Sequence, residues 1–278
     1  MNLKDLNIKH VKELEYLKKL IAWHDKTDII KIVTGIRRCG KSTLFKMFKA
    51  ELQEVYGVEE KQIQSINFED VSFSELLDWK KLHDHLQSNL VPDKMNYLFW
   101  DEIQAVESFE RAVNSLRLKE NVSLYLTGSN SQILSGELAT LLSGRYITIH
   151  IQPLSFKEFV STYKNRENTL VENKIGFDIN GAFTSYLRHG SFLYALQILS
   201  WGGNEQSELI QQFLKGLFDT IILKDVVERK GVKDIGRLNK VVNFIFDNIG
   251  SETSVRNIKN SLESDSGLKI DVLPSKIT

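Results

Sequence analysis

Residues 35–42 have the types and spacing of a loop that holds phosphate groups. They read GIRRCGKS, which fits the pattern G-x-x-x-x-G-K-[ST] without exception. In such a loop the glycines let successive backbone N–H groups point at phosphate oxygens. The lysine bridges the β- and γ-phosphates of a nucleoside triphosphate, and the serine hydroxyl is a ligand of Mg²⁺. The sequence therefore predicts a nucleotide site that contains Gly35, Arg38, Cys39, Gly40, Lys41, Ser42 and Thr43.

Two adjacent acids follow a second apolar stretch. Residues 97–100 read YLFW, and Asp101 and Glu102 come directly after them. An aspartate at such a strand tip is where a P-loop ATPase holds Mg²⁺, and the adjacent glutamate can polarise the attacking water. Taken alone, the pair is also typical of an ordinary solvated strand end. Beside the phosphate loop, it predicts Ser42 and Asp101 as metal ligands and Glu102 as the catalytic base, and it favours hydrolysis over phosphoryl transfer to a small molecule.

A third stretch, residues 124–130, is an apolar strand that ends in polar residues. It reads LYLTGSN. In P-loop ATPases with an inserted strand, this strand lies between the loop strand and the acidic strand, and its polar tip reaches the γ-phosphate. We predict Asn130 for this sensor role, with Ser129 as the second choice. The alternative is a simple turn, for which Gly-Ser-Asn is well suited.

The elements that must position these residues alternate between strand and helix. Apolar, β-branched runs predict five strands, at residues 28–34, 62–68, 97–100, 123–127 and 146–151. Helical periods lie between them, and the first helix begins at Lys41. Such alternation indicates an α/β fold with a parallel sheet and right-handed crossovers.

After Pro153 the pattern changes to helices and loops. The periodicity predicts short helices at residues 182–187 and 192–199, a longer one at 208–227, and two more near 238–249 and 255–262. Ser254 is the expected N-cap of the last. We expect three parts: an ATPase domain with an N-terminal amphipathic helix over residues 1–152, a helical lid over 153–230 and a further segment over 231–278.

Five motifs together resemble one family. TGIRRCGKST, NFED, YLFWDEIQ, YLTGSNSQILSGELATLLSGR and PLSFKEF are similar to motifs of prokaryotic AAA+-superfamily ATPases that usually carry a C-terminal domain of uncharacterised function. The resemblance covers about residues 8–258. It implies the sheet order 5-1-4-3-2, a helical lid, and binding and hydrolysis of ATP with Mg²⁺. At the lid, Ser191 and Leu193 replace the second glycine and the proline of the family's Gly-Gly-x-Pro element.

The resemblance also implies a role for Arg145, which precedes the fifth strand. In AAA+ proteins this region carries an arginine finger that completes the site of a neighbouring subunit. Arg145 is therefore a catalytic candidate and a reason to expect a homo-oligomer. The alternative is a structural arginine at the edge of the sheet.

Composition sets the outer limits. The chain has 278 residues with 36 basic and 36 acidic side chains, so a net charge of zero gives no general attraction to nucleic acid. One cysteine, Cys39, excludes an internal disulfide and a cysteine-based zinc site. Its place at a helix N-terminus near Lys41 predicts a lowered thiol pKa. We find no apolar run of membrane-spanning length and no signal peptide, so we expect a cytoplasmic protein.

The C-terminal segment resembles the start of a winged helix. A basic stretch at residues 229–240 precedes two helices, and Pro274 could open a third. The resembling proteins are longer, so the chain looks truncated at this point. A DNA or protein partner could engage this segment, but half a motif does not predict sequence-specific DNA binding. Besides a sustained ATPase, the sequence therefore leaves open a slowly hydrolysing nucleotide switch that engages such a partner.

Overall fold

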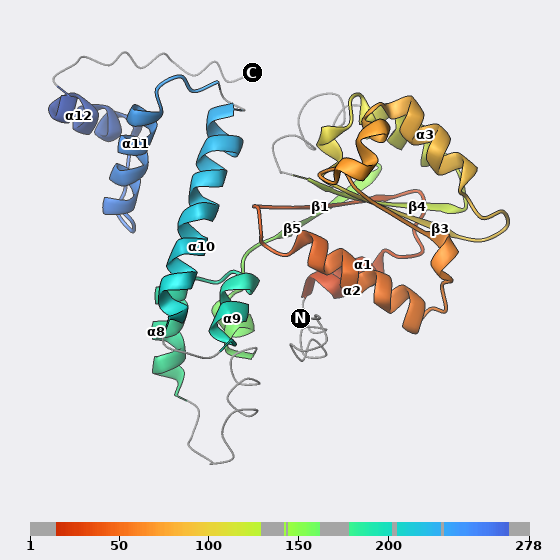
Figure 1. Ribbon diagram of the computed structural model, residues 1–278, viewed down its shortest axis with the longest axis horizontal. Helices are drawn as coiled ribbons and strands as arrows, with labels where there is room; N and C mark the ends of the chain where they lie inside the picture. Colours follow the sequence, from red (N-terminus) through yellow and green to blue (C-terminus); the bar gives the residue numbers. More distant parts are fainter. Residues whose placement is uncertain are drawn as a thin grey trace. The chain divides into compact units, whose positions relative to one another are not determined.

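The computed structural model describes residues 15–128, 142, 144–161, 178–201, 205–228 and 231–266. The chain forms two compact units, residues 1–213 and residues 214–278 (Figure 1). The boundaries predicted after residues 152 and 230 remain predictions.

The first unit contains a five-stranded sheet in which every neighbouring pair is parallel. Its strands are β1 (Ile30–Gly35), β2 (Ile63–Asn67), β3 (Asn96–Asp101), β4 (Val122–Gly128) and β5 (Tyr146–Ile151). They lie in the order β2-β3-β4-β1-β5, which confirms the predicted order. Because the strands are parallel, the ends of β1, β3 and β4 that carry the predicted site residues meet at one edge of the sheet.

Helices cover both faces of this sheet, as a parallel sheet requires. On β3, Tyr97 and Phe99 belong to a core shared with α1 (Glu15–Ala22) and α2 (Lys41–Glu54). The alternate residues Leu98 and Trp100 belong to a second core, shared with α3 (Trp79–Ser88) and α4 (Phe109–Leu116). Figure 1 shows α1 and α2 on one side of the sheet and α3 on the other. Burying each of these large side chains contributes about 1.5–3 kcal/mol, so the two layers fix the sheet that carries the site.

Among the described residues of the first unit, three short 3₁₀ helices lie in the connections. They are η2 (Glu60–Gln62), η3 (Val71–Leu77) and η4 (Ile103–Ala105). The last follows β3 directly, and its residue Ile103 is fully buried. We did not predict these elements, because runs this short lack the repeats on which periodicity depends.

A helical part follows β5 in the first unit. It comprises a short helix at residues 156–161, α8 (Ile179–His189), α9 (Leu193–Leu199) and the start of α10 (Gln206–Thr220). The ring of Tyr186 lies 5.4 Å from that of Phe156 and 5.3 Å from that of Phe159. The Tyr186 hydroxyl also donates a hydrogen bond to the carbonyl oxygen of Leu154 at 3.1 Å. These contacts join α8 to the short helix after β5.

The second unit begins within α10, which continues into the π-helical η5 (Ile221–Glu228). Two further helices follow, α11 (Ile235–Asp247) and α12 (Val255–Ser266). Ser254 caps α12 as predicted, since its hydroxyl accepts a hydrogen bond from the Asn257 N–H at 3.1 Å. Pro274 lies outside the described residues, so the winged helix remains a prediction. Among the described helices, none has the length and apolar character that a bilayer crossing requires.

Candidate nucleotide site

The phosphate loop joins β1 to α2 and depends on glycine at two positions. Gly35 has φ 154°, and a Cβ there would lie 2.5 Å from the carbonyl oxygen of Ile151 on β5. Gly40 has φ 109°, and a Cβ there would lie 3.1 Å from Cδ1 of Leu193. At Gly35 the obstacle is backbone, which cannot move aside as a flexible side chain can. The loop can therefore follow this path only with glycine at its start.

The first turn of α2 is open to an anion. The helix begins at Lys41 after Gly40, and no side chain of the described residues caps it. The first N–H groups of a helix have no partner within the helix, and the helix dipole places partial positive charge beside them. Since the loop leads directly into this turn, both features act on the same space, as in known phosphate sites.

Lys41 is the buried cation of the site. Its side chain is 6% exposed. The ammonium donates hydrogen bonds to the carbonyl oxygens of Gly35 at 3.1 Å and Ile36 at 3.4 Å. It also lies 3.5 Å from Oε1 of Glu102. These partners are all oxygens, so the ammonium can exchange them for phosphate oxygens while it remains hydrogen-bonded.

Asp101 joins three elements at the carboxyl edge of the sheet. The Ser42 hydroxyl, on α2, donates a hydrogen bond to Asp101 Oδ2 at 2.5 Å. The Thr127 hydroxyl, on β4, donates a hydrogen bond to Asp101 Oδ1. Carboxylate and hydroxyl oxygens are the hard donors that Mg²⁺ prefers, and Mg²⁺ usually binds one or two carboxylates together with phosphate oxygens and water. The oxygen set therefore fits this ion.

Thr127 belongs to the site but was not predicted from the sequence. Besides its contact with Asp101, its hydroxyl accepts a hydrogen bond from the Glu102 N–H at 3.0 Å. The residues predicted at this polar strand tip, Asn130 and Ser129, lie outside the described residues. The signal that places Thr127 beside Asp101 is the register of β4 against β3. Leu126 pairs with Trp100, so the next positions along β4 and β3 are Thr127 and Asp101.

Glu102 has an unusual backbone conformation. With φ 56° and ψ 46°, it is left-handed, which is uncommon for a residue other than glycine. Its side chain is 14% exposed and faces Lys41 with one oxygen. Its other oxygen accepts a hydrogen bond from Gln104 Nε2 at 2.5 Å. Such strained residues cluster at functional sites, where the surrounding structure holds them in place.

Two loop residues differ in their surroundings. Arg37 pairs with Glu69 through Nη1 and Oε1 at 3.0 Å, whereas Arg38 is exposed.

Cys39 is buried, and burial raises the pKa of its thiol despite the opposing effect of Lys41. The prediction of a lowered pKa for Cys39 was therefore wrong, because desolvation of the thiolate outweighs the nearby charge and the backbone hydrogen bonds.

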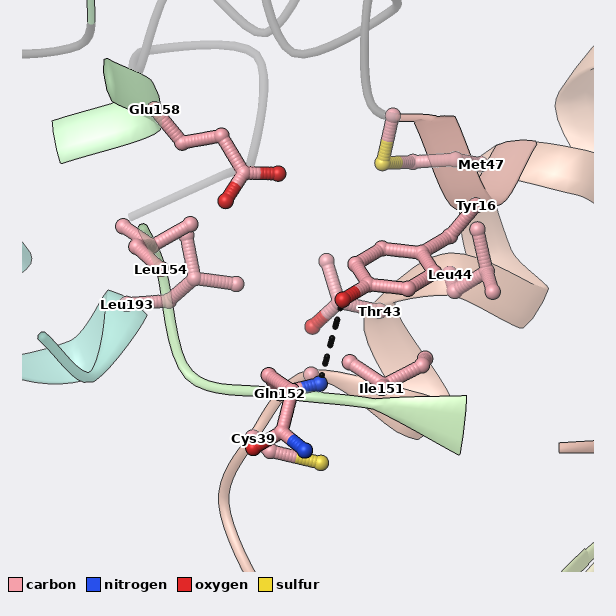
Figure 2. Close-up of a pocket in the computed structure, with 11 residues that line it drawn as sticks. Tyr16, Cys39, Thr43, Leu44, Met47, Ile151, Gln152, Leu154, Glu158 and Leu193 are labelled. Carbon is pink, nitrogen blue, oxygen red and sulfur yellow. Dashed lines mark hydrogen bonds between the residues drawn. The ribbon is translucent and has the colours of Figure 1, made fainter. Parts of the chain in front are cut away.

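A small pocket lies beside the phosphate loop (Figure 2). Its mainly apolar wall consists of Tyr16, Cys39, Gly40, Thr43, Leu44, Met47, Ile151, Gln152, Leu154, Glu158 and Leu193. The Tyr16 hydroxyl accepts a hydrogen bond from the Gln152 N–H at 3.3 Å, drawn as a dashed line in Figure 2. Apolar walls with few polar groups are typical of small-molecule sites. Leu193, where the family pattern has proline, brings α9 to this wall.

Arg145 lies away from these residues. It directly precedes β5, and its carbonyl oxygen accepts a hydrogen bond from the Ile30 N–H at 3.0 Å. Arg145 precedes the amino end of β5, and Ile30 is at the amino end of β1. Gly35 and Ile151 lie at the carboxyl ends of the same two strands. At about 3.3 Å per residue, the length of β5 separates Arg145 from the phosphate loop. The structure thus brings together every described candidate of the site except Arg145.

Comparison with known proteins agrees with this geometry. Residues 27–160 match the model of a family described as an AAA domain. This segment is an AAA domain. The match begins just before β1 and extends into the short helix after β5, so it includes the whole sheet and the phosphate loop.

Two curated relatives are uncharacterised proteins. One, from Haemophilus influenzae, is 36% identical over 251 residues, which cover 90% of this chain and 59% of the relative. The other, MJ1544 from Methanocaldococcus jannaschii, is 29% identical over 242 residues, which cover 84% of this chain and 50% of the relative. The chain thus spans between half and three-fifths of their lengths. Among solved structures, AMPPCP-bound DnaA from Aquifex aeolicus is 15% identical with a TM-score of 0.42, and the match covers 90% of this chain and 75% of that chain.

Proposed function

We propose that this chain binds ATP together with Mg²⁺ and hydrolyses it. The observation that carries the proposal is the contact of Asp101 with Ser42 and Thr127, next to Lys41 and Glu102. A phosphate loop alone would fit any nucleotide-binding protein. A metal-binding acid and a second acid beside the loop lysine are the parts that hydrolysis needs.

Each residue has a separate task in this mechanism. Lys41 and the first turn of α2 bind the β- and γ-phosphates. Ser42 and Asp101 would hold Mg²⁺, which neutralises charge on the phosphates when bound. Glu102 accepts the proton of the attacking water, and Thr127 keeps Asp101 in position. Asn130 is proposed to contact the γ-phosphate.

The remaining predicted residues fit the rest of the nucleotide. The adenine ring would pack against the apolar wall of this small pocket, to which Cys39 and Thr43 contribute. The backbone of Gly35, Arg38 and Gly40 would follow the phosphates. Leu193 lines the pocket and also lies beside Gly40. One side chain of the helical part would therefore be near both the adenine ring and the phosphates.

Turnover of Mg·ATP by a Glu102→Gln variant tests the mechanism. We expect this variant to bind ATP as the unchanged chain does but to hydrolyse it about 100- to 1,000-fold more slowly, because the amide cannot accept the proton. Glu107→Gln is the matched control, since Glu107 is exposed beyond the η4 turn and outside the site. Equal turnover in the Glu102→Gln and unchanged proteins would contradict the mechanism.

Two parts of the proposal concern partners. Arg145 would act on the site of a second copy of the chain, because its own site lies at the other edge of the sheet. The segment over residues 231–278 would engage DNA or a protein, on the strength of its basic start. Turnover measured with and without DNA tests the second point. Retained ADP with little turnover would instead favour a nucleotide-dependent switch.

A further inference from the structure

The carboxylate of Glu102 is held by two side chains, one at each oxygen. Lys41 Nζ lies 3.5 Å from Oε1, and Gln104 Nε2 donates a hydrogen bond to Oε2 at 2.5 Å. Gln104 has no role in the mechanism described above. Its bond to Glu102 is charge-assisted, which makes it stronger than a bond between two neutral groups.

The other end of the Gln104 amide, Oε1, has no hydrogen-bond partner within the described part of the chain. Oε1 is buried, and no donor among the described residues reaches it. An unpaired buried acceptor costs stability, so a glutamine held here for stability alone would be a poor choice. Reversing the amide would place Oε1 against the carboxylate of Glu102, where two acceptors repel. The charge of Glu102 therefore sets the orientation of the amide.

The backbone that carries Gln104 is a short, well-anchored turn. Glu102 is left-handed, and the chain then enters η4, where the Ala105 N–H donates to the Glu102 carbonyl oxygen at 3.1 Å. Ile103, between the two polar side chains, is fully buried in the core under α3 and α4. Gln104 thus reaches Glu102 from a short, anchored turn, which suits a side chain that must hold another in one orientation.

We propose that Gln104 is a positioning residue that keeps the Glu102 carboxylate aimed during hydrolysis, an inference that rests on the proposed ATPase function. When Lys41 binds phosphate, it must leave the carbonyl oxygens and the carboxylate that it contacts now. Gln104 competes for no phosphate and stays with Glu102. It then holds the carboxylate after the lysine has changed partners.

Two substitutions of similar size test this role. Gln104→Met removes the amide donor, and Gln104→Glu replaces it with a repelling carboxylate. We expect kcat for ATP to fall about 10-fold in the first and further in the second, because a misaligned base loses rate. KM and the affinity for AMPPCP should change less than about twofold, since the role affects the transition state and not ground-state binding.

A matched control separates positioning from stability. Gln62 is a buried glutamine at the amino end of β2, whereas the site lies at the carboxyl ends of the strands, and its Nε2 donates a hydrogen bond to the Met95 carbonyl oxygen at 2.7 Å. Gln62→Met should lower the thermal unfolding midpoint and leave kcat unchanged. In a Glu102→Ala background, Gln104→Met should cause no further loss of residual turnover, because the residue through which it acts is gone.

The outcomes distinguish this inference from the function on which it rests. If the unchanged chain turns over ATP and Glu102→Gln does not, but folded Gln104→Met and Gln104→Glu keep normal kcat, this inference alone is overturned. An additional loss from Gln104→Met in the Glu102→Ala background would also overturn it. If the unchanged chain hydrolyses no ATP, both are overturned. Should Gln104→Met fail to fold, the isosteric Gln104→Glu decides.

Discussion

Strand β1 carries Lys31 near its start, and Lys41 begins α2 just beyond its end. Both lysines are buried, at 0% and 6% exposed, but their surroundings differ. Lys31 donates hydrogen bonds to the Lys26 carbonyl oxygen and, at 2.9 Å, to the Ser123 hydroxyl, and its ammonium lies 5.0 Å from the centre of the Tyr125 ring. Lys41 instead contacts two loop carbonyl oxygens and a carboxylate.

The difference separates a structural lysine from a functional one. Burial lowers the pKa of Lys31 to about 7, and the charges of Asp28 and Asp25 offset this only in part. Its partners belong to the strand β4 and to the turn before β1, which no ligand could replace. The partners of Lys41 line a loop with two glycines and an open helix end. The edge of the sheet at the amino end of β1, which we call the closed edge, therefore offers no contacts that a ligand could replace. The edge at the carboxyl end of β1 offers contacts that a ligand can replace.

The largest effect should come from Lys41→Met. This change removes the charge that binds the phosphates in both the ground and transition states, so ATP turnover should fall at least about 1,000-fold. Binding of AMPPCP, followed by calorimetry, should be lost as well. Lys31→Met is the matched control at the other end of β1 and should leave AMPPCP affinity unchanged. Similar losses of AMPPCP affinity in the two variants would contradict the difference in role between Lys31 and Lys41.

A smaller effect is expected from Arg145→Ala, at the closed edge. If Arg145 completes the site of a second copy, turnover per chain should rise with protein concentration, and the variant should lose that rise. At high concentration we expect a deficit of about 100-fold, as for loss of one donor to transition-state charge. Flat turnover per chain in both proteins, at every concentration, would show that the closed edge takes no part in catalysis.

The last effect bears on stability and not on turnover: it is the pH dependence of folding at Lys31. Its pKa is near 7 in the folded chain and near the ordinary 10.5 in the unfolded chain, so the unfolded chain binds more protons between these values. Stability should therefore rise with pH from about 7 to 10, by up to about 1.4 kcal/mol per unit. Urea unfolding of the unchanged chain and of Lys31→Met measures this term. An equal slope in both proteins would place the source elsewhere.

Much of the fold was predictable because it depends on patterns within short segments. Apolar runs marked all five strands, and the glycine and lysine spacing marked the phosphate loop. The order of the strands came from the family resemblance and is confirmed. The cap at Ser254 and the two helices α11 and α12 also followed from local signals.

What was missed depends on how separate segments meet. The contact of Thr127 with Asp101 requires the register of β4 against β3, which one strand alone does not contain. The hydrogen bond from Gln104 follows from the left-handed turn at Glu102. For Cys39, neighbouring charge could be seen in the sequence, but the burial that decides its pKa could not. Asn130 lies outside the described residues, and its role remains a proposal.

The left-handed backbone of Glu102 sets stability against activity at a single position. A residue with a Cβ costs roughly 1–2 kcal/mol in this conformation, a cost that glycine would avoid. The chain therefore gives up part of its thermodynamic margin to aim one carboxylate. A search for more stable variants would be drawn to glycine or asparagine at residue 102, and it would improve the fold by removing the group on which hydrolysis depends.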